Sequence, residues 1–202
     1  MKNFFLALTV AATFVTGCKK EDNNPDSQTY YPITAGTVHY YQATNTINGN
    51  VEIASDSVTT KDTLINGINY RIVMQRWSGY ESQTFVRISG GNYYTLVGNI
   101  LEQTQGFVNR DFLFFKDNAK VGDSWIATLD ETYGNMICEV VETNGTYTVG
   151  GHTFTNVCAT RLRRENGTVF ETLFHAKGVG LIKSVYPGVG GYNTEITSYS
   201  VE

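Results

Sequence analysis

Asn-Gly dipeptides divide much of this chain into short runs of apolar and β-branched residues. Asn and Gly both accept the positive φ angles of a type I′ turn, which joins two adjacent antiparallel strands. The four dipeptides, followed by three weaker glycine-containing versions, are Asn48-Gly49, Asn66-Gly67, Asn144-Gly145, Asn166-Gly167, Gly90-Gly91-Asn92, Gly134-Asn135 and Gly150-Gly151. The pattern therefore predicts a succession of β-hairpins.

Between these turn signals the side chains alternate with a period of two, as they do in a β-strand. Tyr70, Ile72 and Met74, for example, alternate with a more polar set to which Gln75 and Trp77 belong. The nearest candidate for a helix, residues 99–110, is interrupted by a glycine. We therefore expect strands near residues 37–46, 51–61, 63–77, 83–89, 92–98, 107–116, 124–133, 136–143, 146–149, 152–164, 168–176, 179–186 and 193–201.

These strands predict an all-β domain that forms an antiparallel meander. Around a dozen strands exceed what a flat open sheet tolerates, so a strongly curved sheet or barrel is favoured. A β-sandwich remains the alternative, because the alternation of side chains is the same in both architectures.

The first seventeen residues have the build of a secretory signal peptide. Lys2 gives a basic start, and the uncharged run over residues 4–15 is shorter than the roughly 20 residues of a membrane-spanning helix. Val15-Thr16-Gly17-Cys18 resembles the lipobox of bacterial lipoproteins. That resemblance implies cleavage before Cys18 and lipidation of Cys18, with diacylglycerol on the thiol and an acyl chain such as palmitate on the amine. Several acyl chains hold a protein on a membrane firmly, at about 0.8 kcal/mol per buried CH₂.

Residues 18–29 are polar and are interpreted as a disordered tether, which leaves residues 30–202 as a single domain. Lipoproteins retained at the inner membrane tend to carry Asp after the lipidated cysteine, whereas Lys19 follows Cys18 here. We therefore expect an outer-membrane location, on either the periplasmic or the exposed side. The run Lys19-Lys20-Glu21-Asp22 also resembles the export signal of surface lipoproteins in Bacteroidota-type bacteria.

The formal net charge of the chain is −4, and the sequence has no basic patch. Its densest cationic cluster, Arg161, Arg163 and Arg164, alternates along one expected strand and is followed by Glu165. Nucleic acid is therefore not an expected partner.

Catalytic motifs are sparse, and we expect a protein that is not an enzyme and uses no cofactor or metal. The histidines, His39, His152 and His175, are far apart, and no metal-binding or serine-nucleophile motif surrounds them. The carboxylates considered for acid-base chemistry lie in polar surroundings that indicate solvated side chains, and they are Glu102, Asp111, Asp130 and Glu131.

Binding is the more plausible activity, because the chain is rich in tyrosine. Adjacent residues of a strand face opposite sides, so one ring of each pair such as Tyr40-Tyr41 should point outward. Trp77, on the polar face of its strand, and Tyr80 are the candidate ligand contacts. We expect a lipid-anchored binding or accessory protein that takes a glycan or a hydrophobic ligand, with a structural subunit of an outer-membrane assembly as the alternative.

Four phrases together resemble a large group of uncharacterised bacterial lipoproteins. They are Tyr31-Pro32-Ile33-Thr34-Ala35-Gly36, Lys120-Val121-Gly122-Asp123-Ser124-Trp125, residues 148–157, and Ala176-Lys177-Gly178-Val179-Gly180-Leu181-Ile182-Lys183. The resemblance implies a β-rich fold, akin to the half-barrel of lipoprotein carriers, and it implies no catalytic residue. Those carriers cover their concave sheet with helices, whereas this chain offers no clear helix for that purpose.

We expect Cys138 and Cys158 to be unpaired, on an argument from strand register. If Asn144-Gly145 and Gly150-Gly151 are both two-residue turns, about eight residues of strand separate the two cysteines, whereas a disulfide needs Cα atoms within about 7 Å. The competing register opens residues 143–153 into one long excursion and sets the cysteines opposite each other. Thiol titration of the unfolded, unreduced protein distinguishes the two registers.

Overall fold

The computed structural model describes residues 29–97, 110–128, 135–188 and 190–202. The expected signal peptide, Cys18 and most of the expected tether lie outside these ranges, as do Glu102, Asp130 and Glu131. Within them, no helix is long and apolar enough to cross a membrane. The strands are β1 (Val38–Asn45), β2 (Val51–Ile65), β3 (Ile68–Trp77), β4 (Tyr80–Ser89), β5 (Asn92–Val97), β6 (Arg110–Lys116), β7 (Ser124–Thr128), β8 (Met136–Val149), β9 (His152–Arg164), β10 (Val169–Ala176), β11 (Gly180–Val185) and β12 (Tyr192–Ser200).

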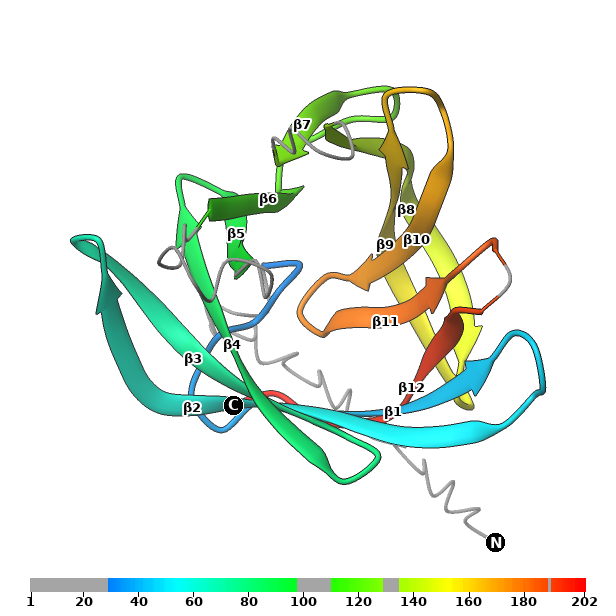
Figure 1. Cartoon of the computed structure of the whole chain (residues 1–202), viewed down its shortest axis with the longest axis horizontal. Coiled ribbons are helices and arrows are strands. Elements are labelled where there is room, and N and C mark those ends of the chain that lie inside the picture. Colours follow the sequence, from blue (N-terminus) through cyan, green and yellow to red (C-terminus); the bar gives the residue numbers. More distant parts are fainter. Residues whose placement is uncertain (1–28, 98–109, 129–134, 189) are drawn as a thin grey trace, which may run out of the picture.

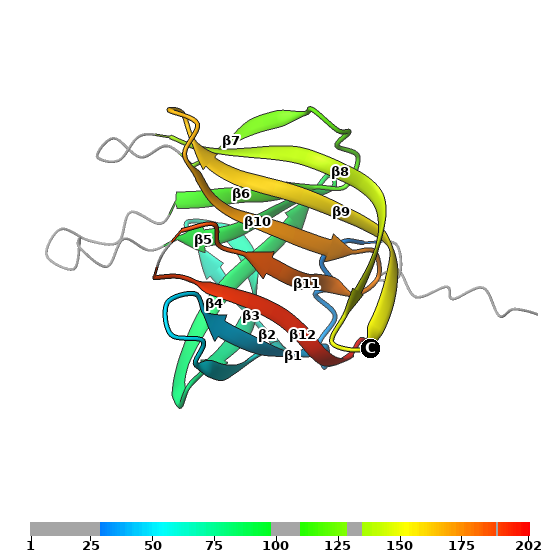
Figure 2. The same cartoon turned by 90° about the vertical axis from the view of Figure 1, so that its right-hand side faces the viewer.

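These twelve strands form one antiparallel sheet in the order β6-β5-β4-β3-β2-β1-β12-β11-β10-β9-β8-β7. The sheet curls until its two edges approach each other, which gives a nearly closed barrel (Figures 1 and 2). The prediction of an antiparallel meander in a strongly curved sheet or barrel is confirmed. The sandwich alternative is wrong, because one continuous ladder runs through all the described strands.

The edges β6 and β7 are held by side chains rather than by a backbone ladder. Trp125 on β7 donates its Nε1 hydrogen to the backbone oxygen of Leu113 on β6 at 2.8 Å. The thiol of Cys138 on β8 donates to the oxygen of Phe114 at 3.4 Å. These bonds satisfy carbonyl groups that an edge strand would otherwise expose.

Three of the glycine-containing signals, Asn66-Gly67, Gly90-Gly91 and Gly150-Gly151, form two-residue turns, whereas Asn48-Gly49 and Asn166-Gly167 lie in longer connections. Asn66 and Gly67 have φ angles of 51° and 77° between the paired residues Ile65 and Ile68, as a type I′ turn requires. Gly150-Gly151 likewise joins β8 to β9. The turn predicted at Asn144-Gly145 is wrong, because those residues form an irregularity within β8, and the strands expected at 136–143 and 146–149 are one strand.

The cysteine register differs from both registers considered from the sequence. Cys138 lies opposite Leu162 and Cys158 lies opposite His175 in the ladders. Both cysteines are buried free thiols.

The N-terminal segment, residues 29–37, crosses one end of the barrel and packs into it (Figure 2). Tyr30 and Tyr31 contact the rings of Phe115 and Phe114, with ring centroids 5.0 and 5.2 Å apart. This segment, which we call the plug, belongs to a buried cluster that also contains Trp125 and Cys138. The plug closes the end of the barrel at which the described chain begins.

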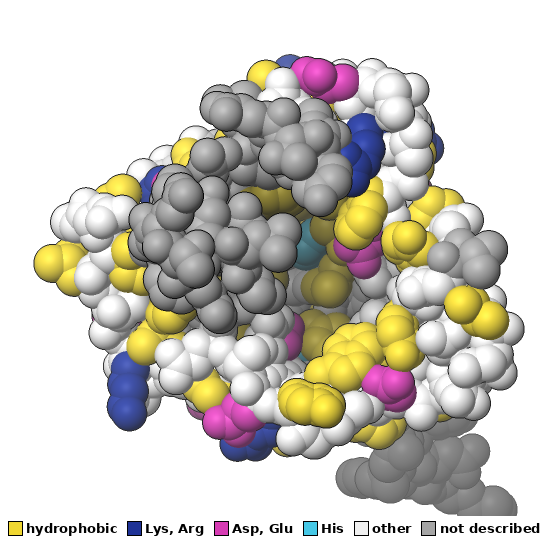
Figure 3. Space-filling model, in the orientation of Figure 1, with side chains coloured by type: hydrophobic (Ala, Val, Ile, Leu, Met, Phe, Trp, Pro, Cys, Tyr) yellow, Lys and Arg dark blue, Asp and Glu magenta, His cyan; other side chains and the backbone are white. Residues whose placement is uncertain are grey.

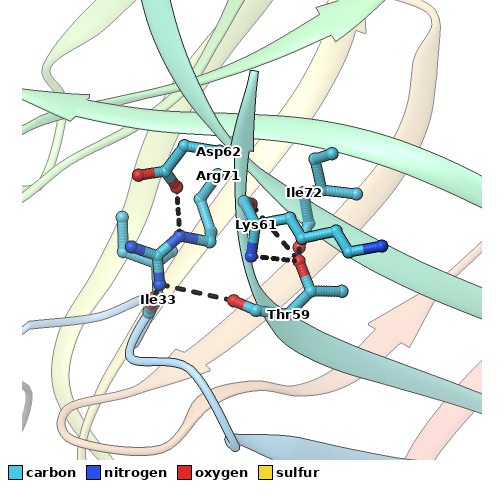
Figure 4. Close-up of polar contacts among 6 residues, drawn as sticks. All are labelled: Ile33, Thr59, Lys61, Asp62, Arg71 and Ile72. Atoms are coloured by element: carbon cyan, nitrogen blue, oxygen red, sulfur yellow. Dashed lines mark hydrogen bonds and ion pairs between the residues drawn. The ribbon is translucent and has the colours of Figure 1, made fainter.

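Arg71 fastens the plug to the wall of the barrel (Figure 4). Its guanidinium donates to the oxygen of Ile33 at 3.1 Å and forms an ion pair with Asp62 at 2.5 Å. Thr59 donates to the oxygen of Ile72 at 2.8 Å, which stabilises the irregularity of β2 beside that ion pair.

Candidate functional site

An open groove of about 510 Å³ lies beneath the hairpin that joins β3 to β4. At the tip of the hairpin, the amide of Ser78 donates to the oxygen of Ile53 on β2 at 3.4 Å, which extends the β2–β3 ladder to the turn. The residues that line the groove are Tyr40, Ile53, Ala54, Ser55, Arg76, Trp77, Ser78, Gly79, Tyr80 and Glu81. The structure therefore brings the two predicted ligand contacts, Trp77 and Tyr80, to one groove.

Tyr80 is the most accessible ring of the groove. Its side chain is 82% exposed, and Tyr40 and Ile53, which face outward from β1 and β2, are also exposed. Arg76 and Glu81 form an exposed ion pair, with 2.7 Å between Nε and Oε2. The groove thus combines apolar rings with a charged pair that can exchange hydrogen bonds with a ligand.

Trp77 is positioned differently from what its strand pattern suggested. It lies opposite Ala54 in the ladder and shares the inner face of the barrel with Val73, which is fully buried. The polar set of β3 therefore faces inward, and the apolar set with Ile72 and Met74 faces outward. The expectation that the polar face of this strand points outward is wrong.

Glu52 holds the Trp77 ring at the rim of the barrel. Trp77 donates its Nε1 hydrogen to Oε2 of Glu52, which also accepts a bond from Ser78 at 2.7 Å. Tyr192 donates to Oε1 of the same carboxylate at 2.8 Å and packs edge-on against the indole, with centroids 5.2 Å apart. These bonds, first that from Ser78, lower the pKa of Glu52. Trp77 is thus a fixed wall, and Tyr80 is the free contact.

The barrel is hollowed at the end opposite the plug. Figure 3 shows apolar, acidic and histidine side chains within this hollow. Asp56 on β2, Gln75 on β3 and Thr84 on β4 lie on the inner face, where they are only half-buried. Gln75 donates to Asp56 at 3.3 Å and accepts from Thr84 at 2.7 Å.

The histidines do not converge on a common centre. His39 and His175 lie on the inner face and are buried, and burial lowers the pKa of each, that of His175 to about 3. His152 follows the Gly150-Gly151 turn and is exposed. Among the described residues, no group of three histidine, cysteine or acidic side chains could hold a metal ion.

The carboxylates considered from the sequence also separate. Asp111 accepts hydrogen bonds from Arg87 and Tyr70, so it is a paired structural group. The less solvated carboxylates are Asp56 and Glu171, because burial raises the pKa of Asp56 to about 6 and also raises that of Glu171. Neither carboxylate was among those considered from the sequence, because their position on the inner face depends on the strand register.

No protein-family model matches the chain, and no curated protein matches it. Two solved structures are similar to it. One, described as a candidate lipoprotein of Parabacteroides distasonis ATCC 8503, is 12% identical, with 86% of this chain and 99% of that chain covered and a TM-score of 0.46. The other, described as a candidate exported protein with a YmcC-like fold from Bacteroides fragilis NCTC 9343, is 11% identical, with the same coverage and a TM-score of 0.49. The solved neighbours of this β-rich barrel are thus described as lipoprotein or exported proteins, and their descriptions name no ligand.

Proposed function

We propose that this chain is a lipid-anchored protein of the outer membrane that binds carbohydrate in the groove beneath the β3–β4 hairpin. The observation that carries the proposal is the exposed ring of Tyr80 beside the Arg76–Glu81 pair. The activity proposed is binding without turnover, so a bound glycan is recovered unchanged.

Carbohydrate fits the chemistry of this groove. One face of a pyranose ring presents C–H groups that pack on an aromatic ring, and its hydroxyl groups bond to charged side chains. Tyr80 and Tyr40 offer rings, while Arg76 offers donors and Glu81 offers acceptors. A purely apolar ligand would leave the charged pair without a role.

The position of the groove also supports a ligand from the aqueous side. Cys18 precedes the first residue of the plug by eleven positions, and the plug lies at one end of the barrel (Figure 2). The β3–β4 hairpin lies toward the other end (Figure 2). A lipid on Cys18 would therefore place the membrane nearer the plug, so the groove favours a soluble or surface glycan over a membrane lipid.

Substitution of Tyr80 tests the site. We expect the wild-type protein to bind members of a glycan array, and Tyr80→Ala to weaken binding at least about tenfold, which corresponds to one lost stacking contact. Tyr199→Ala is the matched control, because that ring is also exposed but lies on β12, outside the groove. The proposal fails if the array shows no binding or if the two variants bind alike.

A second candidate function, the accessory subunit, is favoured by an aliphatic strip beside the groove. Val51 and Ile53 at the start of β2 and Ile47 in the connection before it are 53%, 63% and 66% exposed, which is unusual for three aliphatic side chains so close in sequence. Affinity purification from membranes tests it. A partner that is lost in Ile53→Glu and kept in Tyr80→Ala would favour the accessory role over glycan binding.

A further inference from the structure

Asp56 lies on the wall of the hollow with one fixed hydrogen-bond donor. Gln75 donates to Oδ1 of Asp56, and its own oxygen is occupied by Thr84. This second bond fixes the orientation of the Gln75 amide, so that its NH₂ group points toward the carboxylate. The described residues offer this half-buried carboxylate no other hydrogen bond.

No cation of the described chain compensates the charge of Asp56. The five ion pairs of the described residues involve Asp62, Glu81, Asp111, Glu139 and Glu195, and neither Asp56 nor Glu171 belongs to them. An ionised carboxylate in a confined space is costly unless it is paired. Although burial raises its pKa to about 6, Asp56 remains mostly ionised at pH 7.5.

His39 does not supply the missing charge. It faces Asp56 across the β1–β2 ladder, and its Nε2 bonds to the oxygen of Val179 at 2.6 Å. Because a carbonyl only accepts, Nε2 carries the hydrogen, and burial lowers the pKa of this imidazole. The ring facing Asp56 is therefore neutral at pH 7.5.

Two aromatic rings lie within the field of Asp56. Burial, followed by the charge of Asp56, raises the pKa of both Tyr31 and Tyr41. The hydroxyl of Tyr41 donates its hydrogen to the backbone oxygen of Leu181 at 3.2 Å, so it does not donate a hydrogen bond to Asp56. In the β1–β2 ladder Tyr41 is a diagonal neighbour of Asp56 on the same face. A carboxylate near aromatic rings suits an ammonium group, since both attract a cation.

We propose that the hollow of the barrel is a second binding site, in which Asp56 takes the ammonium group of a small organic amine. The amine enters through the hollowed end (Figure 3), donates hydrogen bonds to Asp56, and lays its apolar body toward Tyr41 and Tyr31. This site is separate from the outer groove, so it does not depend on carbohydrate binding.

Titration with n-butylamine at pH 7.5 tests the site, with n-butanol as the uncharged probe of the same length. Chemical-shift changes should show that the wild-type protein binds the amine and not the alcohol. Asp56→Asn should weaken amine binding at least about tenfold, because it keeps the shape of the side chain and removes its charge. Unchanged dispersion of the remaining NMR signals establishes that this variant folds.

Two further variants test whether the amine binds Asp56 itself or is only attracted by the negative charge of the protein. Glu171→Gln removes another carboxyl group from the inner face of the barrel, and Glu81→Gln removes one from the outer groove; each should change amine affinity less than about threefold. Equal binding of amine and alcohol, or an equal loss in Asp56→Asn and either control, would overturn the proposal. Glycan binding that persists in Asp56→Asn leaves the carbohydrate proposal standing whichever result is obtained.

Discussion

Gly150 occupies a position that a side chain cannot share. It has a φ of 57° in the turn between β8 and β9, and a Cβ atom built there would lie 2.0 Å from the backbone oxygen of Ile196 on β12. The next residue, Gly151, has a φ of 81° and open space around it. A side chain at Gly151 is therefore disfavoured only by the backbone conformation, whereas a side chain at Gly150 is disfavoured by the conformation and also by the contact with β12.

We expect Gly151→Ala to lower the free energy of unfolding by about 1–2 kcal/mol, the cost of a left-handed conformation for alanine. Gly150→Ala should lower it by roughly 2 kcal/mol more, because the backbone of β12 must also move. Urea denaturation measures both values. Equal losses in the two variants would contradict the close approach to Ile196.

Side-chain orientation is the property that the sequence predicted least well at this scale. Gln75 and Trp77 belong to a polar set, and polar sets normally face water. In this molecule the inner face of β3 also reaches water, because a barrel of twelve strands is too wide for its side chains to fill. The expectation that the polar set of β3 reaches water was therefore correct, but that water lies inside the barrel rather than outside it. Trp77 was identified because it belongs to the polar set, whereas Asp56 was missed because the inner face was not expected to be polar.

The plug is the element on which closure of one end of the barrel depends. Backbone hydrogen bonds join the amide of Gly36 to Val58 at 3.0 Å and the amide of Gly178 to Thr29 at 2.7 Å. Arg71 adds the side-chain link to Ile33. The plug is not part of the sheet, so these contacts and its aromatic packing must hold it.

Arg71→Met should loosen the plug before it unfolds the barrel. We expect faster hydrogen exchange at the amides of Gly36 and Gly178 and a loss of about 1–2 kcal/mol in the free energy of unfolding, since one ion pair and the hydrogen bonds to the oxygens of Ile33 and Thr59 disappear. Arg76→Met is the matched control, because its ion pair with Glu81 is more exposed. Unchanged exchange at both amides in Arg71→Met would show that the plug is held without Arg71.

At the level of elements, the strands were predicted closely and the irregularities were not. β9 has the expected bounds, because continuous alternation between strong turn signals defines a strand. Asn144-Gly145 carries the same signal as Asn66-Gly67, yet it lies within β8. Local propensity is the same in both places, and only the pairing of β8 with β9 over their whole length distinguishes them.

The pH dependence of stability is a property of the whole molecule to which Asp56 contributes with an unusual sign. Its pKa in the folded protein, about 6, lies above the ordinary value of 3.8, so the folded state binds the proton more tightly than the unfolded state. The contribution of this group to stability is therefore greatest below pH 4 and is lost as the pH rises through 6. Asp62 behaves oppositely, because Arg71 lowers its pKa.

Asp56→Asn should therefore gain stability relative to the wild-type protein as the pH rises. Between pH 4 and pH 8 the difference in free energy of unfolding should move by about 2–3 kcal/mol in favour of the variant. Asp62→Asn should move in the opposite direction over the same range. Urea denaturation at the two pH values measures both trends, and trends of the same sign would show that Asp56 is solvated.

The overall architecture followed from the sequence because the number of hairpins, more than any single residue, decides that the sheet must curl. Two features of the site did not follow. The groove is formed jointly by β1, β2 and the β3–β4 hairpin, and the hollow exists because a segment outside the sheet fills only one end of the barrel. Both depend on contacts between segments distant in sequence, for which alternation and turn residues give no signal.

The sheet begins and ends at β6 and β7, which are consecutive in the chain, while β1 and β12 are paired at its centre. The described strands therefore follow the order of a simple meander that would start at β7 and end at β6 if β12 were joined to β1. In this chain, β1 and β12 lie in the middle of the sheet, and the edge strands β6 and β7 lie in the middle of the sequence. Every other ladder joins strands that are neighbours in sequence and can form locally. The β1–β12 ladder instead pairs residues from the two ends of the domain, such as Val38 and Ser200. Closing so long a loop is the slow step expected in folding. During synthesis β12 is the last of the described strands to emerge, and until it pairs with β1 the inner edge of β1 has no ladder partner.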